Sequence, residues 1–210
     1  MLSSKSSEIK AIRILLLGDN IVGKTAIIHS ILNLEFTESI MPTLGIERFQ
    51  TKFTLKNGNI IKISFNDTAG GERFRSVELK KLLYSDCIVL VFDVTNRKSF
   101  ENINKRLEDV NNNSNNLPLV LFGNKIDEKR KVTSEEAKNF AEKMKIPYFE
   151  TSAKTKEGIN EGFSYIIKET YEKLEKNIEN NIKLEEKNIE EDKTKCVGKN
   201  KNVKKNQKKK

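Results

Sequence analysis

The sequence predicts an α/β domain built on a mostly parallel β-sheet with one antiparallel edge strand. Short, uninterrupted apolar runs alternate along the chain with longer amphipathic segments. Such runs are typical of parallel strands that are covered by helices on both faces. Two other segments, FQTKFTL and IIKISF, alternate apolar and polar residues around KNGN, which is the pattern of a β-hairpin.

Each expected element follows from a local pattern. The buried strands lie in the apolar runs 12–18, 87–94, 117–124 and 146–152. The helix 134–144 begins with TSEEA, in which a hydroxyl caps the first turn. The last core helix includes Phe163, Ile166, Ile167, Thr170 and Tyr171. After about residue 173, Glu, Lys and Asn dominate, and the few isoleucines that could extend this helix are too few to hold it against a core.

The net charge of the protein resides in its C-terminal segment. The 210 residues contain 39 Lys and Arg against 30 Asp and Glu, a formal charge of +9. Nine lysines and no acid follow Asp192, which leaves 30 basic and 30 acidic residues in 1–192. We therefore expect no basic face on the domain and no specific nucleic-acid partner for it.

We expect a cytoplasmic protein. Its two cysteines, Cys87 and Cys196, lie far apart, which favours a reducing compartment without disulfides. No apolar run comes near the length of about 20 residues that spans a bilayer. The N-terminus has neither an apolar signal core nor a Gly at position 2. The sequence thus predicts that the protein is not secreted and has no transmembrane segment.

The segment GDNIVGKT, residues 18–25, fits the phosphate-loop pattern G-x-x-x-x-G-K-T between an apolar strand and a helix. Backbone N–H groups of such a loop converge on phosphates, Lys24 adds a positive charge, and Thr25 offers a hydroxyl to Mg²⁺. The alternative is an ordinary glycine turn. Because a β-branched residue fits positive φ poorly, we expect Ile21 at negative φ.

The segment GNKID, at the end of the third long apolar run, indicates which base is bound. The Asp127 carboxylate can accept from N1–H and N2–H₂ of guanine, a donor pair that adenine lacks. The segment ETSAK follows the next strand, where the backbone N–H of Ala153 could reach the guanine carbonyl. Taken alone, GNKID could also be a polar turn after a strand.

With these motifs in order, the chain resembles the Ras superfamily of small GTPases and is most similar to the Rab family. The resemblance covers about residues 10–172 and rests on GDNIVGKT, TLGIE, DTAGGERFRS, FDVTNRKSFENI, GNKID and ETSAK. It implies the P-loop NTPase (small G-protein) fold, with a six-stranded sheet and about five flanking helices. It also implies a small monomeric GTPase, with GTP and GDP as ligands and Mg²⁺ as the metal.

The resemblance assigns roles to individual residues. Thr43 matches the threonine that reaches Mg²⁺ and the γ-phosphate, Asp67 the carboxylate behind the Mg²⁺ water, and Gly70 the γ-phosphate-sensing N–H. The expected metal residues are Thr25, Thr43 and Asp67, and the expected catalytic positions are Lys24, Thr43, Gly70 and Gly71. The expected nucleotide-binding residues are Gly18, Asp19, Asn20, Ile21, Val22, Gly23, Lys24, Thr25, Ala26, Phe36, Thr43, Gly70, Asn124, Lys125, Asp127, Ser152, Ala153 and Lys154. Phe36 falls where the family places an aromatic ring against guanine; the alternative is a core-facing phenylalanine at a helix end.

Several positions depart from the Rab pattern. Rab proteins have WDTAGQERF where this chain has NDTAGGERF, so Asn66 replaces a tryptophan and Gly71 replaces the catalytic glutamine. Arg48 occupies the place of an effector-contacting phenylalanine, unless the register slips by one and Phe49 takes that role. Arg106 stands where the family usually has a tryptophan. We expect effectors, an exchange factor and an activating protein as partners, but none known for other Rab proteins is transferred to this chain.

The loss of the glutamine predicts slow intrinsic GTP hydrolysis, because Gly71 has no side chain to orient the attacking water and makes the loop freer. Glu72 could swing inward, or an activating protein could supply the missing group. Two alternatives to a Rab-like switch in membrane traffic remain open at this stage. One is a GTP-locked binding or scaffold protein with negligible turnover; the other is an ATP-using P-loop enzyme, which GNKID and TSAK disfavour.

The tail completes a division of the chain into an N-terminal extension (1–9), a GTP-binding domain (10–172) and a charged tail (173–210) that is Lys-rich from 193. Cys196 is followed by fourteen residues, so the C-terminus has no prenylation box. The lysines could give weak, salt-sensitive association with anionic intracellular membranes. They could instead form a nuclear import signal, bind RNA or remain a solvated tail.

Overall fold

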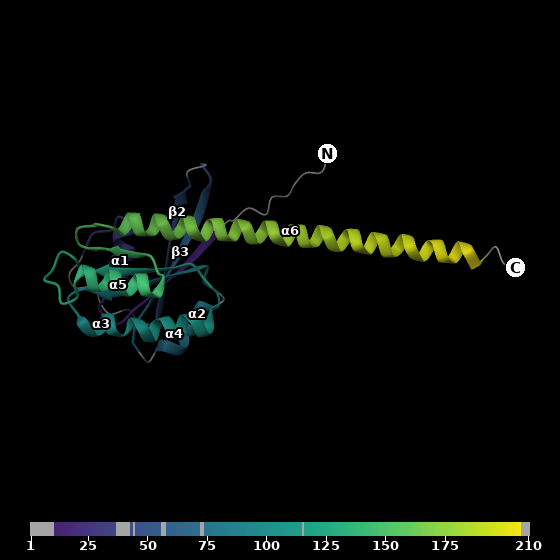
Figure 1. Cartoon of the computed structure of the whole chain (residues 1–210). Coiled ribbons are helices and arrows are strands. Elements are labelled where there is room, and N and C mark those ends of the chain that lie inside the picture. The colour runs from purple at the N-terminus through teal and green to yellow at the C-terminus, as the bar shows by residue number, and fades with distance from the viewer. Residues whose placement is uncertain are drawn as a thin grey trace. The chain divides into compact units, whose positions relative to one another are not determined.

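The computed structural model describes residues 11–36, 43, 45–55, 58–71, 74–114 and 116–206, with side chains described up to Leu184. Its centre is a six-stranded sheet in the order β2-β3-β1-β4-β5-β6 (Figure 1). The strands are β1 (Ala11–Leu17), β2 (Ile46–Thr54), β3 (Ile60–Thr68), β4 (Cys87–Asp93), β5 (Leu119–Asn124) and β6 (Tyr148–Glu150). Only β2 and β3 pair antiparallel. The predicted mostly parallel sheet with one antiparallel edge strand is confirmed.

Helices cover both faces of this sheet. The helices are α1 (Lys24–Ile31), α2 (Arg75–Leu82), α3 (Arg97–Glu101), α4 (Ile103–Asn113), α5 (Ser134–Met144) and α6 (Ile159–Asn206). Buried side chains of α2, α3, α4 and α5 share one cluster with β1, β4 and β5. α1 and the first turns of α6 pack on the opposite face (Figure 1). The result is a three-layer α/β arrangement, with helices on both faces of a mostly parallel sheet.

The core explains why the strands appear in the sequence as uninterrupted apolar runs. All seven residues of β4 are buried, because helices cover both sides of this central strand. On the α6 face, the ring of Phe163 makes edge-to-face contacts with Phe65 and Phe122, with ring centroids 5.3 and 5.4 Å apart. All three rings are fully or almost fully buried.

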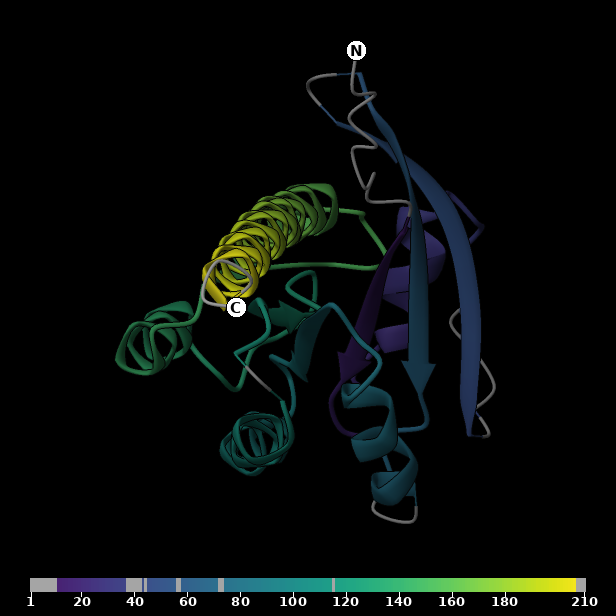
Figure 2. The same ribbon diagram turned by 90° about the vertical axis from the view of Figure 1, so that its right-hand side faces the viewer.

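The β2–β3 hairpin, shown in Figure 2 as two long blue strands, is buried on one side only. Phe49 is half-buried and contacts His29 of α1, with ring centroids 5.5 Å apart. Arg48 is exposed and lies opposite Asn66 of β3. This one-sided burial accounts for the alternating sequence pattern of the hairpin. Phe49 therefore packs on α1, whereas Arg48 is exposed on the hairpin.

The expected start of α5 is also confirmed. The Thr133 hydroxyl oxygen accepts a hydrogen bond from the backbone N–H of Glu136 at 3.2 Å, which satisfies one free donor of the first turn. Glu135 and Glu136 lie in that turn, where negative charge is favoured by the helix dipole.

The chain divides into two units, Ile9–Tyr171 and a second composed of Met1–Glu8 with Glu172–Lys210. The helix extension that the sequence left open is present, because α6 ends at Asn206. Glu172 and Lys176, like Glu179 and Lys183, have the i, i+4 spacing that supports an exposed helix without a core. Within the described residues, no helix has a stretch that is both long and apolar enough to cross a bilayer.

The topology brings distant loops together. Because β1, β3, β4, β5 and β6 run parallel, their carboxyl ends lie at the same edge of the sheet. In α/β sheets this edge is where ligands bind. The loops after β1, β3, β5 and β6 carry nearly all of the residues that the sequence assigned to nucleotide binding.

Candidate functional site

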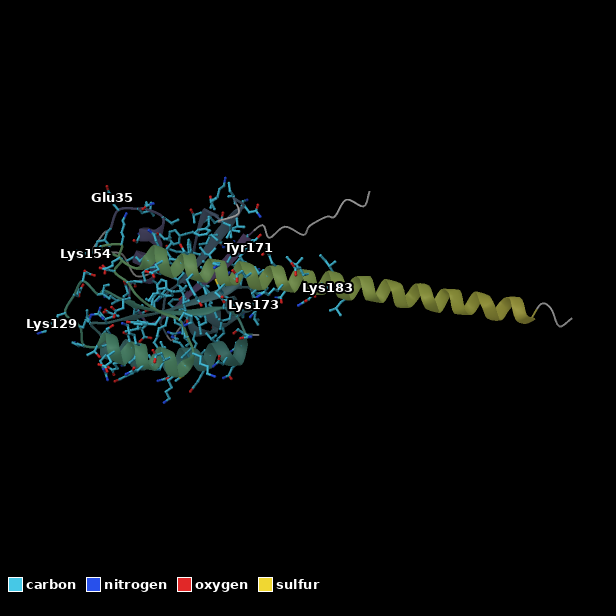
Figure 3. The ribbon with its side chains drawn as sticks, turned by 45° about the horizontal axis from the view of Figure 1, so that its top comes forward. Glu35, Lys129, Lys154, Tyr171, Lys173 and Lys183 are labelled. Carbon is cyan, nitrogen blue, oxygen red and sulfur yellow. The ribbon has the colours of Figure 1, made fainter. Side chains whose placement is uncertain are left out.

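A cavity of about 440 Å³ opens at this edge of the sheet. That volume lies in the range of small-molecule sites. Its lining residues are Asn20, Ile21, Gly23, Lys24, Thr25, Ala26, Phe36, Thr43, Thr68, Ala69, Asn124, Lys125, Asp127, Glu128, Ala153 and Lys154. In the view of Figure 3, the labelled side chains of Glu35, Lys154 and Lys129 lie toward this same end of the domain.

The phosphate loop closes tightly around the start of α1. Gly23 caps the helix at φ 97, a left-handed conformation, and the first turn contains no acidic residue. A Cβ on Gly23 would come within 2.4 Å of the Asn124 amide nitrogen, so the position also excludes a side chain on steric grounds. The N–H groups of the helix start are thus left to face the cavity, where the helix dipole favours an anion.

Lys24 supplies the positive charge of the loop. It is 5% exposed, and its Nζ donates to the carbonyl oxygens of Gly18 at 3.0 Å and Asp19 at 2.8 Å. Burial lowers the pKa of Lys24 to about 8, an effect that the nearby Asp67 carboxylate opposes. Two neutral carbonyls do not balance a buried ammonium, and a phosphate in the cavity would.

Ile21 does not have the backbone conformation expected from its side chain. Its φ is 66°, in the left-handed region, and its side chain is 81% exposed. The prediction of negative φ was wrong because the closure of the phosphate loop dictates the backbone at this position, whatever residue occupies it. A β-branched residue there carries conformational strain.

Three oxygen-bearing side chains converge beside Lys24. The Thr25 hydroxyl donates to Asp67 Oδ2 at 2.5 Å, and the Thr43 hydroxyl donates to the same oxygen at 3.0 Å. Asp67 is fully buried, and its Oδ1 has no hydrogen-bond partner among the described residues. Two hydroxyls and a carboxylate with an unsatisfied oxygen are hard donors that suit Mg²⁺, which uses few protein ligands and keeps several waters.

No group of three or more His, Cys, Asp or Glu that could hold a metal occurs in the part of the chain that the structure describes. A site built from Thr25, Thr43 and Asp67 would contain only one residue of these four types, so it would not form such a group. The residues present fit the metal that the sequence implied.

At the other end of the cavity, Asn124 connects three loops. Its buried amide Nδ2 donates to the carbonyl of Val22 at 2.9 Å, and its Oδ1 accepts from the backbone N–H of Ala153 at 3.2 Å. The hydroxyl of Thr151 lies 3.4 Å from the same oxygen. In this structure, the Asn124 side chain therefore bonds to protein groups, and the Ala153 N–H is directed at Asn124.

Asp127 and Lys125 keep functional groups at the cavity. Ser152 donates to Asp127 Oδ1 at 2.5 Å and accepts from the N–H of Thr155 at 3.0 Å, which fixes the carboxylate. Lys125 has φ 67 and pairs with Asp93 of β4 at 2.6 Å. Both side chains line the cavity. The carboxylate of Asp127 and the aliphatic part of Lys125 are therefore held in fixed positions on the cavity wall.

Phe36 is 39% exposed and lines the cavity, which contradicts the core-facing alternative. An aromatic ring that is only partly buried beside a polar cavity can stack on a planar ligand.

The loop after β3 approaches the phosphate loop closely. Gly70 has φ 71, and a Cβ on it would lie 2.5 Å from Lys24 Nζ. A Cβ on Gly71 would lie 3.3 Å from Nδ2 of Asn20, so the carboxamide of Asn20 borders the space where the family has a glutamine. Glu72, which could have replaced that glutamine, lies outside the described residues.

Most of the residues predicted for the site line the cavity, and the others support it. Seven predicted residues are not part of the lining but lie against residues that are: Gly18, Asp19, Val22, Asp67, Gly70, Gly71 and Ser152. Sequence reasoning missed Thr68, Ala69 and Glu128. Thr68 and Ala69 lie within DTAGG, between the predicted Asp67 and Gly70, and Glu128 directly follows GNKID. Counting every residue of DTAGG, and one residue beyond GNKID, would have found them.

A three-layer α/β fold with a glycine-rich phosphate loop at a helix start defines a P-loop nucleotide-binding protein. A family model described as "Ras family" matches residues 13–172. The chain is 35% identical over 173 residues to the Ypt/Rab-type GTPase ypt7 of Schizosaccharomyces pombe, covering 78% of this chain and 84% of the relative. It is 38% identical over 168 residues to the Ras-related protein RABG3f of Arabidopsis thaliana (75% and 81%) and 37% over 167 residues to the Ras-related protein SEC4 of Saccharomyces cerevisiae (79% and 77%).

The chain therefore belongs to the Ras family and is a Rab-like small GTPase. Ras-family GTPases bind GTP and GDP, generally with Mg²⁺. This family membership removes the ATP-using enzyme from the alternatives that the sequence left open.

The strain at Ile21 gives a first prediction. Ile21→Asn should raise the free energy of unfolding by about 1 kcal/mol, because asparagine adopts left-handed backbone at lower cost than a β-branched residue. Urea unfolding of the nucleotide-free protein measures this without a contribution from ligand binding. Ile21→Val keeps the branched Cβ and should change nothing. If the asparagine variant is no more stable than the valine control, the backbone at position 21 is not strained.

Proposed function

We propose that this Rab-like GTPase is a GTP-dependent switch in vesicle-mediated and intracellular protein transport, with slow intrinsic hydrolysis. The observation that carries the proposal is that one cavity contains a phosphate loop, a fixed carboxylate suited to guanine and a set of oxygen ligands suited to Mg²⁺. The Rab and Ypt relatives support the role in membrane traffic.

The base end of the cavity is proposed to read guanine. The Ser152 hydroxyl engages one oxygen of Asp127, and the carboxylate keeps lone pairs for the paired N–H donors of guanine N1 and N2. Phe36 and the stem of Lys125 line the cavity where they can cover the faces of the base. Lys154 and the backbone of Ala153 complete this end.

The phosphate end is proposed to hold the β- and γ-phosphates. The residues Asn20 to Ala26 contribute backbone N–H groups, and Lys24 contributes its charge. Thr25 and Thr43 would hold Mg²⁺, with Asp67 behind a water of its shell. Bound Mg²⁺ would neutralise charge that develops on the phosphate oxygens.

Slow turnover is proposed from the residues that surround the γ-phosphate position. Catalysis of phosphoryl transfer is mostly positioning and charge stabilisation. In the proposed arrangement, Lys24, Thr43 and Gly70 contact the γ-phosphate. Gly71 has no side chain that could orient the attacking water. The GTP-bound state then persists until an activating protein acts. The absence of a side chain at Gly71 also favours a second candidate function, a GTP-locked scaffold with negligible turnover.

Two measurements separate these candidates. Chromatography of the nucleotide released from denatured protein identifies what is bound. Single-turnover hydrolysis then distinguishes a slow switch from a locked scaffold. Release of adenine nucleotide, or of no nucleotide together with no measurable affinity for GTP, would contradict both.

The remaining parts of the chain are proposed as follows. Residues 10–172 form a monomeric GTP-binding domain, preceded by the extension 1–9. Residues 173–210 form a charged tail whose lysines associate weakly with anionic membranes. The expected partners of the protein are effectors, an exchange factor and an activating protein.

Asp127→Asn tests the base assignment. The variant should bind GTP at least about 100-fold more weakly, because an amide nitrogen replaces an oxygen that accepts charge-assisted hydrogen bonds. It should also gain preference for xanthosine triphosphate, whose C2 carbonyl can accept from the new amide. Glu128→Gln, a change of the neighbouring acid in the cavity lining, is the matched control. Equal GTP affinity in the two variants would refute the assignment.

Gly71→Gln tests the cause of slow turnover. The variant should hydrolyse bound GTP at least about tenfold faster in single-turnover measurements, because its carboxamide can orient the water. Gly71→Ala is the control, since it adds the same Cβ beside Asn20 without the carboxamide. Equal or faster hydrolysis by the wild type would show that another group places the water.

Removal of residues 193–210 tests the tail. Each lysine near an anionic leaflet contributes about 1 kcal/mol at best, so the truncated protein should no longer sediment with phosphatidylserine vesicles at low salt. Its GTP affinity should stay unchanged. A full-length variant with these nine lysines replaced by glutamine controls for length. Sedimentation of the truncated protein would place the membrane contact elsewhere.

A further inference from the structure

Arg106 of α4 is a buried cation that the nucleotide site does not use directly. It is 8% exposed and lies on the side of α4 that faces both α2 and the loop after β3. Its Nη1 pairs with the carboxylate of Glu78 on α2, which is 2% exposed. Its Nη2 donates to the carbonyl oxygen of Gly70 at 2.9 Å. One guanidinium thus joins a helix to the loop nearest Lys24.

The same guanidinium also reaches the phosphate loop. Its Nη2 lies 3.7 Å from Oδ1 of Asp19, whose Oδ2 accepts from Asn102 at 2.6 Å. The backbone carbonyl oxygen of Asp19 accepts a hydrogen bond from Lys24 Nζ at 2.8 Å. Arg106 is therefore connected to Lys24 through Asp19, and it also contacts Gly70, which lies beside Lys24.

Gly70 is held at both ends. The N–H of the preceding residue, Ala69, donates to the carbonyl of Gly45 at 3.1 Å, and the carbonyl of Gly70 accepts from Arg106. Between these two bonds, Gly70 lies so close to Lys24 that a Cβ would meet its Nζ at 2.5 Å. The direction of the Gly70 N–H therefore depends on where Arg106 holds the following peptide.

The arrangement is costly as a purely structural device. A buried ion pair must be removed from water, and an apolar pair of similar volume is often as stable or more so. Here the pair is also incompletely satisfied, because Glu78 Oε1 has no hydrogen-bond partner among the described residues. The family usually has an aromatic residue at the position of Arg106, so an apolar solution fits this fold.

We propose that Arg106 is a positioning residue that couples the γ-phosphate to α2, by holding Gly70 with one arm of its guanidinium and Glu78 with the other. The inference rests on the proposed function, in which the Gly70 N–H addresses the γ-phosphate. When that phosphate is present, Gly70 is drawn toward it and Arg106 transmits this position to α2. When it is absent, Gly70 loses that contact while Arg106 stays paired with Glu78.

This coupling predicts an effect on GTP and none of similar size on GDP, because only GTP carries the phosphate that Gly70 would contact. By linkage, whatever Arg106 contributes to the position of Gly70 appears as a difference between the two affinities. A residue with a purely structural role would weaken both nucleotides alike, so the ratio of the two affinities separates the two roles.

The test compares binding of GDP and of a non-hydrolysable GTP analogue, with Mg²⁺, to the full chain. Arg106→Met with Glu78→Met removes both charges together and leaves no buried ion unpaired. Arg106→Lys keeps a cation beside Glu78 but cannot contact two partners with a planar fork. Both variants should bind the analogue about tenfold more weakly, the loss of one charge-assisted hydrogen bond, and GDP within about twofold.

Asp109→Asn is the matched control. Asp109 pairs with Arg75, which is a second ion pair between α2 and α4. The control weakens this pair and leaves Arg106 and Glu78 unchanged, so its ratio of affinities should equal that of the wild type. Thermal unfolding of each GDP-bound variant reports whether the fold is retained.

The outcomes are distinct. A reduced GTP preference in both Arg106 variants, with a normal ratio in Asp109→Asn, supports the coupling. An unchanged ratio in folded Arg106→Lys and in the double variant, with tight GTP and GDP binding by the wild type, overturns the coupling and leaves the proposed function standing. A wild type that binds neither nucleotide would overturn the proposed function, and this inference with it.

Discussion

The buried carboxamide of Asn124 is the interaction on which the geometry of the site depends. Asn124 is the last residue of β5. Its side chain bonds to Val22 in the phosphate loop and to Ala153 in the loop after β6. Three segments that are far apart in the sequence are thus fixed by one side chain with no exposure to solvent. Removing either half of the amide would leave a buried polar group without a partner, which costs about 1–3 kcal/mol. Gly23 has no side chain because that amide nitrogen occupies the space.

The two ends of the cavity are built differently. At the proposed base end, Asp127, Lys125 and Asn124 each have a protein partner that holds the side chain in place. At the proposed phosphate end, the polar groups bond to one another. Lys24 donates to backbone carbonyls, and Thr25 and Thr43 donate to Asp67. The proposed base end is thus preformed, whereas the proposed phosphate end would exchange its internal hydrogen bonds for contacts to the ligand. Such a division suits a protein whose response depends on the number of phosphates.

The strands, the phosphate loop and the place of GNKID at the cavity could be predicted because each is encoded locally, in a run of apolar residues or in a short motif. The backbone of Ile21 could not, because the requirement of loop closure overrode the preference of its side chain. The sequence also marked Arg106 as unusual but could not show why. Its partner Glu78 lies 28 residues away on another helix, and no local pattern connects two residues that meet only after α2 and α4 have packed. The role of Asn124 as a link between loops was likewise hidden, since the same residue type in the same motif is equally compatible with a direct contact to the base.

The order of the sheet also bears on whether copies of this protein can pair through their edge strands. Within the described residues, β2 and β6 are the two edge strands, and an open edge is a template on which a second chain can add a strand and start aggregation. β6 has three residues, too few for a stable intermolecular ladder. β2 is long, with nine residues, but Glu47, Arg48 and Lys52 are exposed along it. A neighbouring copy would have to bury these charges to pair with β2. The charges therefore disfavour a continuous intermolecular sheet at this edge.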